Sequence, residues 1–330
     1  MKRFYKRLIC LVALVLTISG AVIYFTVDIN TLTNLTLFQP WSLALAVAFV
    51  ALGLVLDGSR LMHLVHISRE NITLSQAVQV VFGNYFLALL TPGATGGAVA
   101  QLMFLRKAGV PTGKATVLVF VRTVVSIIFL ILCLPLIFWH DAHILPGVSN
   151  DRLGVLSFIV LLVLLLFFLA VRENLLNHLA VRIARKLALP RRRLFVNIYR
   201  DTQNAIRLLG SSPKAMLLVF IESGLSLIAI YAVVPCLLLG LGVYHVDWYT
   251  VMGRMIFLNM LLYFTPTPGG SGVAEGGFVF LFSEIVPAGT VGIIAVCWRL
   301  IAEYIPFLIG LYYTVKVFGA AFLEKKPPAS

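Results

Sequence analysis

Six runs of apolar residues, each 16 to 27 residues long, constrain the fold of this chain more than any other feature. They are residues 8–27, 41–56, 115–139, 153–171, 215–241 and 291–315. About 20 apolar residues in a helix cross the roughly 30 Å hydrocarbon core of a bilayer. A soluble fold would have to hide all six helices, and a chain with 60% hydrophobic and 12% charged residues has too little polar surface for that. The sequence therefore predicts an all-α polytopic membrane protein with six full crossings.

The basic residues predict how the chain is oriented. Most of the 26 Lys and Arg residues fall in blocks at residues 2–7, 60–69, 106–114, 172–214 and 316–326. The linkers 28–40, 140–152 and 242–250 hold only Arg152 between them. Because cytoplasmic loops are enriched in Lys and Arg, we expect a cell-membrane protein with both termini in the cytoplasm. The net charge of +13 then reports orientation, and no nucleic-acid partner is expected.

The sequence also supports a specific expectation for each of three further segments. Residues 1–27 resemble a secretory signal, but the apolar run is long enough to span, so we expect an uncleaved first helix. Residues 172–214 are basic and have an apolar face at helical spacing, which is typical of a helix on the anionic inner leaflet. An ordinary solvated loop helix is the alternative for that segment. Residues 321–330 form a short tail.

Two shorter apolar segments, residues 73–105 and 251–285, are each interrupted by proline and glycine. The interruptions read TPGATGG at residues 91–97 and TPTPGGSG at residues 265–272. Proline and clustered glycine end helices, and the limbs on either side reach only about 20 Å as helices. Each segment therefore predicts a re-entrant hairpin that enters the membrane, breaks near its middle and returns, with the second helix starting near Ala98 or Val273.

The two interruptions also match each other. With a shift of 174 residues, five of eleven positions are identical and Gln101 falls on Glu275. The charge blocks place both ends of the first hairpin inside and both ends of the second outside. Residues 1–145 and 150–320 then form two inverted repeats, a pattern found in secondary transporters. Lipid cannot satisfy irregular backbone, so we expect the two breaks to meet near the midplane and to line a polar chamber. Their helix N-termini would attract a phosphate.

Charged residues inside apolar segments are expensive and are functional candidates by default. Arg299 and Glu303 are four residues apart, so a structural ion pair and a binding site are both open. Glu275 begins the second half of hairpin two, where its carboxylate is expected to cap the helix and could carry a proton. We expect Arg122 and Glu222 to extend toward the cytoplasmic interface, although Arg122 is also a ligand candidate. Arg254 should anchor the chain at the outer interface.

These motifs resemble those of a flippase-like family, the lysylphosphatidylglycerol synthase transmembrane-region family. The resemblance is carried by the first break with Gln101 and LRKAG at residues 105–109, by PTPGGSGVAE at residues 266–275, and by WRL at residues 298–300 with Pro306 and Gly310. It implies a module that translocates a lipid. In the named branch a soluble aminoacyl-transferase domain follows, and we do not expect it here. Gln101 and Ala274 stand where some members carry arginine. The resemblance therefore gives less support for an anionic, aminoacylated lipid as the substrate.

The sequence thus predicts a lipid translocase or lipid carrier that binds a phospholipid or lipid-linked head group. The alternative is a non-transporting membrane partner that presents a lipid to a separate transferase. The residues expected to contact the lipid are Thr91, Pro92, Gly93, Gly96, Gly97, Gln101, Arg122, Thr265, Pro266, Pro268, Gly269, Gly270, Ser271, Gly272, Glu275, Arg299 and Glu303.

An enzyme is not expected. The GGSG sequence around Ser271 matches the motif around a rhomboid-type serine nucleophile, but the last histidine, His245, precedes it, and a turn-forming serine is the better interpretation. His63 and His66 are three residues apart and could bind a metal together, but no further cluster of ligands is evident, so we expect no metal. No Walker motif occurs and no other cofactor is expected.

Overall fold

The computed structural model describes residues 38–141, 144, 152, 154–162, 196, 200, 207, 210–245, 247–287 and 289–323. Within them, four helices are long and apolar enough to cross a membrane: Pro40–Ile67, Thr112–His140, Pro213–Gly240 and Val291–Phe318. They confirm the all-α membrane class and correspond to four of the six predicted crossings. The predicted crossing 8–27 lies outside the described residues. The crossing 153–171, the basic segment 172–214 and the tail 321–330 lie largely outside them.

Helix α3 (Pro40–Ile67) continues eleven residues beyond the end of its predicted crossing, which was expected at residue 56. A proline at its first position suits a helix start, because that amide would have no partner in any case. Asp57 and Arg60 lie within the helix and are buried. The prediction that Arg60 belongs to a cytoplasmic loop is therefore wrong, and the reason is that its charge is paired inside the protein.

Prolines mark changes of geometry in two of the other long helices. The third, α6 (Thr112–His140), contains Pro135 and continues through it. The predicted crossing 215–241 consists of α10 (Pro213–Tyr231) and α11 (Val233–Gly240), because Pro235 has no amide to bond the carbonyl four residues back. Likewise, Pro306 follows a π-helical turn, η2 (Leu300–Tyr304), between α14 (Val291–Arg299) and α15 (Ile305–Leu323).

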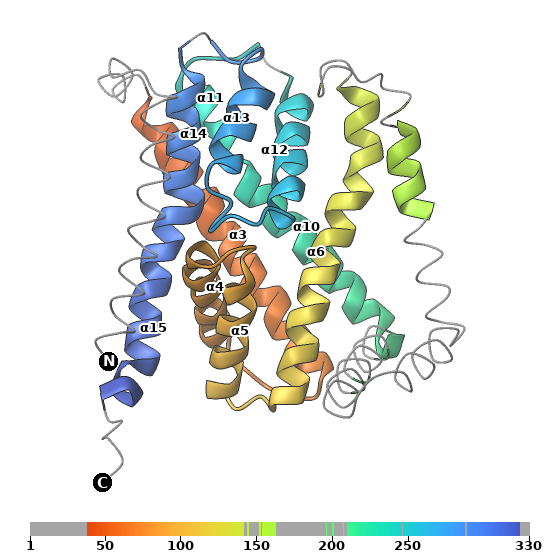
Figure 1. Ribbon diagram of the computed structural model, residues 1–330, viewed down its shortest axis with the longest axis vertical. Coiled ribbons are helices and arrows are strands. Elements are labelled where there is room, and N and C mark those ends of the chain that lie inside the picture. The colour runs from red at the N-terminus through yellow and green to blue at the C-terminus, as the bar shows by residue number, and fades with distance from the viewer. Residues whose placement is uncertain are drawn as a thin grey trace.

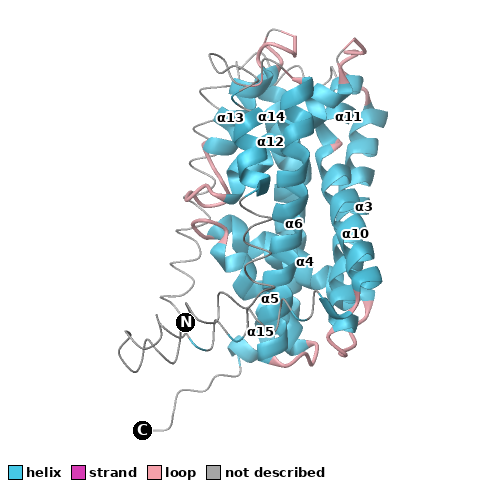
Figure 2. Cartoon of the chain, turned by 90° about the vertical axis from the view of Figure 1, so that its right-hand side faces the viewer, coloured by secondary structure: helices cyan, strands magenta, loops and turns pink. Residues whose placement is uncertain are grey.

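The two interrupted segments form helical hairpins. Hairpin one consists of α4 (Leu74–Leu90) and α5 (Thr95–Lys107), and hairpin two of α12 (Trp248–Tyr263) and α13 (Val273–Phe282). In Figure 1 hairpin one occupies the lower half of the molecule and hairpin two the upper half, while α3 and α6 run alongside both. The two tips face each other at mid-height, as Figure 2 shows. An antiparallel backbone bridge between Pro92 and Pro268 joins them.

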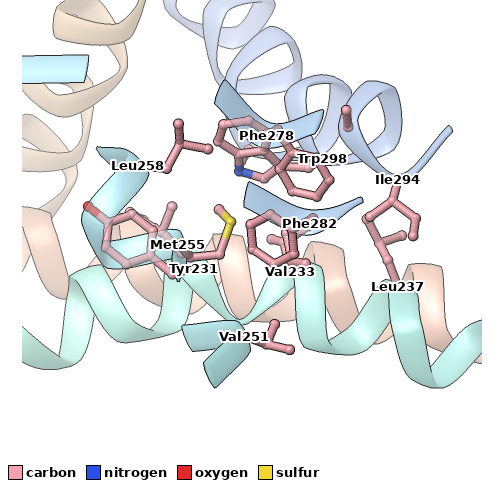
Figure 3. Close-up of a cluster of buried hydrophobic side chains, with 14 of the residues drawn as sticks. Tyr231, Val233, Leu237, Val251, Met255, Leu258, Phe278, Phe282, Ile294 and Trp298 are labelled. Carbon is pink, nitrogen blue, oxygen red and sulfur yellow. The ribbon is translucent and has the colours of Figure 1, made fainter. Parts of the chain in front are cut away.

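Most of each hairpin packs into a different apolar cluster, although Val81 of α4 belongs to the cluster of hairpin two. Hairpin one packs with the second half of α3 and the first half of α6, around residues such as Leu61, Phe104 and Leu118. Hairpin two packs with α11 and α14, and its α13 stacks Phe278 on Phe282, with ring centroids 4.3 Å apart. Figure 3 shows this second cluster, in which Trp298 also stacks on Phe278. The tips therefore lie where two separate apolar cores meet.

Candidate functional site

The tip of hairpin one is a short turn held by a threonine. The Thr91 hydroxyl accepts a hydrogen bond from the Gly96 amide (2.7 Å) and donates one to the Leu87 carbonyl (2.8 Å). Ala94 has a left-handed backbone, and α5 begins at Thr95, three residues earlier than predicted. A side chain at Gly96 would meet the Leu87 carbonyl oxygen at 2.6 Å. Glycine therefore serves close packing here, and the Thr91 hydroxyl satisfies one backbone amide in the first turn of α5.

The tip of hairpin two is held by a glutamate. Gly269, Gly270 and Gly272 all have positive φ, a conformation that favours glycine. The Glu275 carboxylate accepts a hydrogen bond from the Gly272 amide at 2.8 Å, which confirms the predicted helix cap. Ser271 donates to the Pro268 carbonyl at 2.8 Å, so it acts as the expected turn-forming serine.

Several amides at the two helix starts already have partners. Besides Gly96 and Gly272, the Gly97 amide bonds the Ala94 carbonyl (3.0 Å) and the Ala274 amide bonds the Gly270 carbonyl (2.9 Å). The anion that sits at the start of α13 is the protein's own carboxylate, Glu275. The charged side chains around the tips are therefore candidates for binding beside the helix ends.

Arg299 is the centre of the hairpin-two cluster, which comprises Gly269, Glu275, Arg299 and Glu303. Its Nε donates to Glu275 Oε1 (3.1 Å), its Nη2 to the Gly269 carbonyl (3.0 Å) and its Nη1 to Glu303 Oε2. Its side chain is only 2% exposed. The expected Arg299–Glu303 pair is confirmed, and it extends to the tip of hairpin two. The Arg299 guanidinium thus donates hydrogen bonds to two carboxylates and to the backbone of the turn in hairpin two.

Asp57 is the centre of the hairpin-one cluster, which comprises Asp57, Arg60, Gln101 and Arg122. The carboxylate accepts from Arg60 Nε (2.7 Å) and from Arg122 Nε (3.2 Å) and Nη2. Arg122 Nη1 donates to Gln101 Oε1 at 2.7 Å, and Gln101 Nε2 donates to Asn84 Oδ1 at 2.8 Å. All four cluster residues are buried. The cluster therefore connects α3, α6 and both limbs of hairpin one.

The expectation that Arg122 extends to the cytoplasmic interface is wrong. Its guanidinium is buried because Asp57 on α3 balances its charge. Arg60 completes the arrangement by donating to Ser126 on α6 (2.7 Å) and to Ser223 on α10. Sequence reasoning missed Asp57 and Arg60, although an acid and a base three residues apart within a helical run were a usable signal.

Glu222 and Arg254 also differ from expectation. Glu222 is buried and accepts from Ser59 (2.7 Å), and it pairs with His63 Nδ1 at 2.8 Å, so it does not extend to the interface. Arg254 is buried and pairs with Asp141 at 2.6 Å, and it also donates to the Leu281 carbonyl. It therefore ties α12 to α13 and to the end of α6, where an interfacial anchor was expected.

The remaining candidates lie in the two turns. Pro92, Gly93 and Pro266 are exposed, whereas Thr265 is buried and donates to the Leu261 carbonyl at 3.0 Å. The Thr267 hydroxyl is buried and has no hydrogen-bond partner among the described residues. In the same part of the chain, no group of three His, Cys, Asp or Glu could hold a metal ion.

Helices long enough to span a membrane, two broken helices that meet tip to tip, and buried charges behind each tip define a multi-pass membrane protein with a polar interior. The family model described as "Lysylphosphatidylglycerol synthase TM region" matches residues 11–310, and the chain belongs to this family. A UPF0104 membrane protein of Archaeoglobus fulgidus is 23% identical over 254 residues, which cover 72% of this chain and 75% of that protein. The family match confirms the resemblance, both findings agree with a membrane protein, and the description of the family indicates a lipid-related role.

Proposed function

We propose that the protein is a lipid translocase or lipid carrier of the cytoplasmic membrane, and that it binds a phospholipid or lipid-linked head group between the two hairpin tips. One observation carries the proposal: the tips meet at the Pro92–Pro268 bridge, at mid-height of the spanning helices, and each tip adjoins a buried charge cluster. Irregular backbone and charges at that depth need protein, water or a polar ligand around them. A head group passing between the leaflets would meet such an environment.

The proposal includes a topology. Both hairpins are taken as re-entrant, with hairpin one open to the cytoplasm and hairpin two to the outside, so that six crossings and two hairpins form inverted repeats. The opposed hairpins and the matched motifs at residues 91–101 and 265–275 support it. Both termini are then cytoplasmic.

The topology is tested by labelling single cysteines in a cysteine-free background with an impermeant reagent. Cysteines at Ser75 and Gly109, the two ends of hairpin one, should both be protected in whole cells. Cysteines at Tyr249 and Glu284, the exposed ends of hairpin two, should both react. Labelling of Ser75 and Gly109 from opposite sides would show that hairpin one crosses the membrane and would refute the inverted arrangement.

Function is tested with the purified protein in vesicles that contain acyl-labelled fluorescent phosphatidylethanolamine or phosphatidylglycerol. Dithionite bleaches label in the outer leaflet, so a translocase raises the bleached fraction above that of protein-free vesicles. Arg299→Gln should abolish this gain, because the guanidinium joins both carboxylates to the tip of hairpin two. Leu136→Ala is the matched control, since Leu136 is 68% exposed on α6.

The same assay separates the alternatives. A membrane partner that only presents lipid would leave the bleached fraction at the protein-free value for every lipid tested. An intramembrane enzyme would change the mass of the labelled lipid without any other protein, and we propose no such activity. Folding of each variant is checked by thermal unfolding in detergent, so that loss of transport is not confused with loss of structure.

A further inference from the structure

The hairpin-two cluster contains one more carboxylate than it can neutralise. Glu275 and Glu303 share a single guanidinium, Arg299, and their side chains are 4% and 16% exposed. No other cationic side chain bonds either carboxylate in the described part of the chain. A buried net negative charge is costly, and a carboxylic group in that position takes up a proton in preference. The question is which of the two acids carries it.

Both oxygens of Glu275 are already occupied by hydrogen-bond donors. Its Oε2 accepts from the Gly272 amide and its Oε1 from Arg299 Nε. A proton on either oxygen would displace one of these donors. Glu303 is therefore the better candidate of the two acids for binding a proton.

Glu303 has the opposite environment. Its Oε2 accepts from Arg299 Nη1, and among the described residues its Oε1 has no donor. It is the more exposed acid of the two. It also lies in the π-helical turn η2, and single π turns inside α-helices are frequent at functional sites. We propose that Glu303 is a proton-binding site of the translocation cycle, an inference that rests on the proposed lipid-translocase function.

The groups around Glu303 fit this assignment. On its own helical segment Glu303 pairs with Arg299, whose guanidinium also lies 5.5 Å from the centroid of the Tyr304 ring. From α13, Glu275 pairs with the same guanidinium. From α4 the phenol of Tyr85 lies within electrostatic reach of Glu303. α3 also packs against η2 and contributes Asp57, which pairs with both Arg60 and Arg122, so the neighbouring hairpin-one cluster carries one excess positive charge.

The chemical step is the transfer of a proton from a hydronium ion to Glu303 Oε1, which leaves one water molecule. The ionised acid becomes neutral, Glu275 alone balances Arg299, and the cluster loses its net charge. Arg299 Nη1 then keeps a weaker bond to a neutral acid and can be shared with an incoming phosphate oxygen. Proton binding and phosphate binding therefore favour each other, as linkage requires. Translocation should accelerate as the pH falls through the titration of Glu303.

The proton site itself is tested without any transport. Infrared difference spectra of the wild-type protein in phosphatidylglycerol–phosphatidylethanolamine vesicles should show a protonated-carboxyl band that disappears as the pH rises. Glu303→Gln should remove this band. Glu275→Gln should keep it but move its titration to lower pH, because Arg299 then balances Glu303 alone. Glu284→Gln, an exposed acid at the end of hairpin two, should leave the band unchanged.

Transport supplies the second readout, with acyl-labelled fluorescent phosphatidylglycerol as the probe. The wild-type rate should fall about tenfold per pH unit on the alkaline side of the titration. Glu303→Gln should transport at the wild-type low-pH rate at every pH, because it mimics the neutral acid. A pH-dependent rate that survives in Glu303→Gln would overturn the inference.

The infrared result decides the inference even if no lipid moves. A band that persists in Glu303→Gln and vanishes in Glu275→Gln would assign the proton to Glu275, against the proposal. Absence of any titrating band in the wild type would also overturn it. Lack of lipid movement by the wild type at all pH values would instead count against the proposed function, while the spectra still report on Glu303.

Discussion

The two hairpins share a plan but carry opposite charge excesses behind their tips. In the hairpin-one cluster two arginines, Arg60 and Arg122, share the single acid Asp57. In the hairpin-two cluster two acids share the single base Arg299. Arginine does not lose its proton in proteins, whereas a glutamate can gain one. Hairpin one therefore has a fixed charge and hairpin two an adjustable one.

The clusters also differ in what they connect. The hairpin-one cluster joins α3, α5 and α6, and reaches α10 through Ser223, so it acts as a brace between long helices. The hairpin-two cluster joins α13 to the tip and to a π-helical turn, and it bonds the backbone at Gly269 and Gly272 directly. The comparison suggests different roles: the hairpin-one cluster fixes the positions of the long helices, and the hairpin-two cluster changes its charge when a proton binds. Three predictions test that difference.

The largest expected effect comes from removing the sole acid of the hairpin-one cluster. Asp57→Ala leaves two buried arginines without a counter-charge, which should destabilise the fold by about 3–5 kcal/mol. Glu303→Gln leaves the Arg299–Glu275 pair intact and should cost far less. Thermal unfolding in detergent compares them, and equal losses of stability would remove the distinction between brace and responsive site. Asp57→Ala combined with Arg122→Gln should recover part of the loss.

A smaller effect is expected from adding a methyl group at each tip. At Gly97 the new Cβ would lie 2.4 Å from Asn84 Oδ1, and such overpacking costs about 1–3 kcal/mol. At Gly270 the neighbour is the flexible end of Leu262 (2.9 Å), and the left-handed backbone, with φ of 67°, adds about 1–2 kcal/mol of strain. Gly97→Ala should therefore couple strongly to Asn84→Ala in a double-mutant cycle, and Gly270→Ala weakly to Leu262→Ala. Similar coupling energies in both cycles would contradict this account.

The smallest effect concerns the residues that begin the hairpins. Thr73 caps α4 with Gln76 as a neutral pair, whereas Asp247 caps α12. Hydrogen bonds from the Thr250 hydroxyl and then from His140 lower the pKa of Asp247 from 3.8 to about 2. Replacing either cap with alanine should cost about 1 kcal/mol at neutral pH.

The two caps should differ in their pH dependence. Because the pKa of Asp247 is lower in the folded protein, its contribution is complete above the unfolded value of 3.8 and disappears as the pH falls toward about 2. The difference in melting temperature between wild type and Asp247→Ala should shrink in that window, and the Thr73→Ala difference should not change. A constant Asp247 difference down to pH 2 would rule out this role of the charged cap.

Sequence reasoning found the hairpins because proline and glycine act locally on the backbone, as at residues 91–97 and 265–272. It also found the Arg299–Glu303 pair, whose members are close in sequence. It missed the burial of Arg122 and Arg254, because their acids Asp57 and Asp141 are 65 and 113 positions away. One sequence does not reveal which distant acid meets which base. The predicted crossing ended at residue 56 for the same reason. The sequence does not show that Asp57 is paired, and an unpaired aspartate would have ended an apolar span.

The contact between the tips has a mechanical consequence. Proline has no amide to donate, and the described residues form no backbone hydrogen bond across the Pro92–Pro268 bridge at standard geometry. Each turn instead bonds within itself, through Thr91 in one and Glu275 in the other. The contact between the two turns can therefore separate without loss of a standard backbone hydrogen bond, while each turn keeps its own hydrogen bonds. The two turns can therefore shift relative to each other while α3 and α6 continue to run alongside both hairpins.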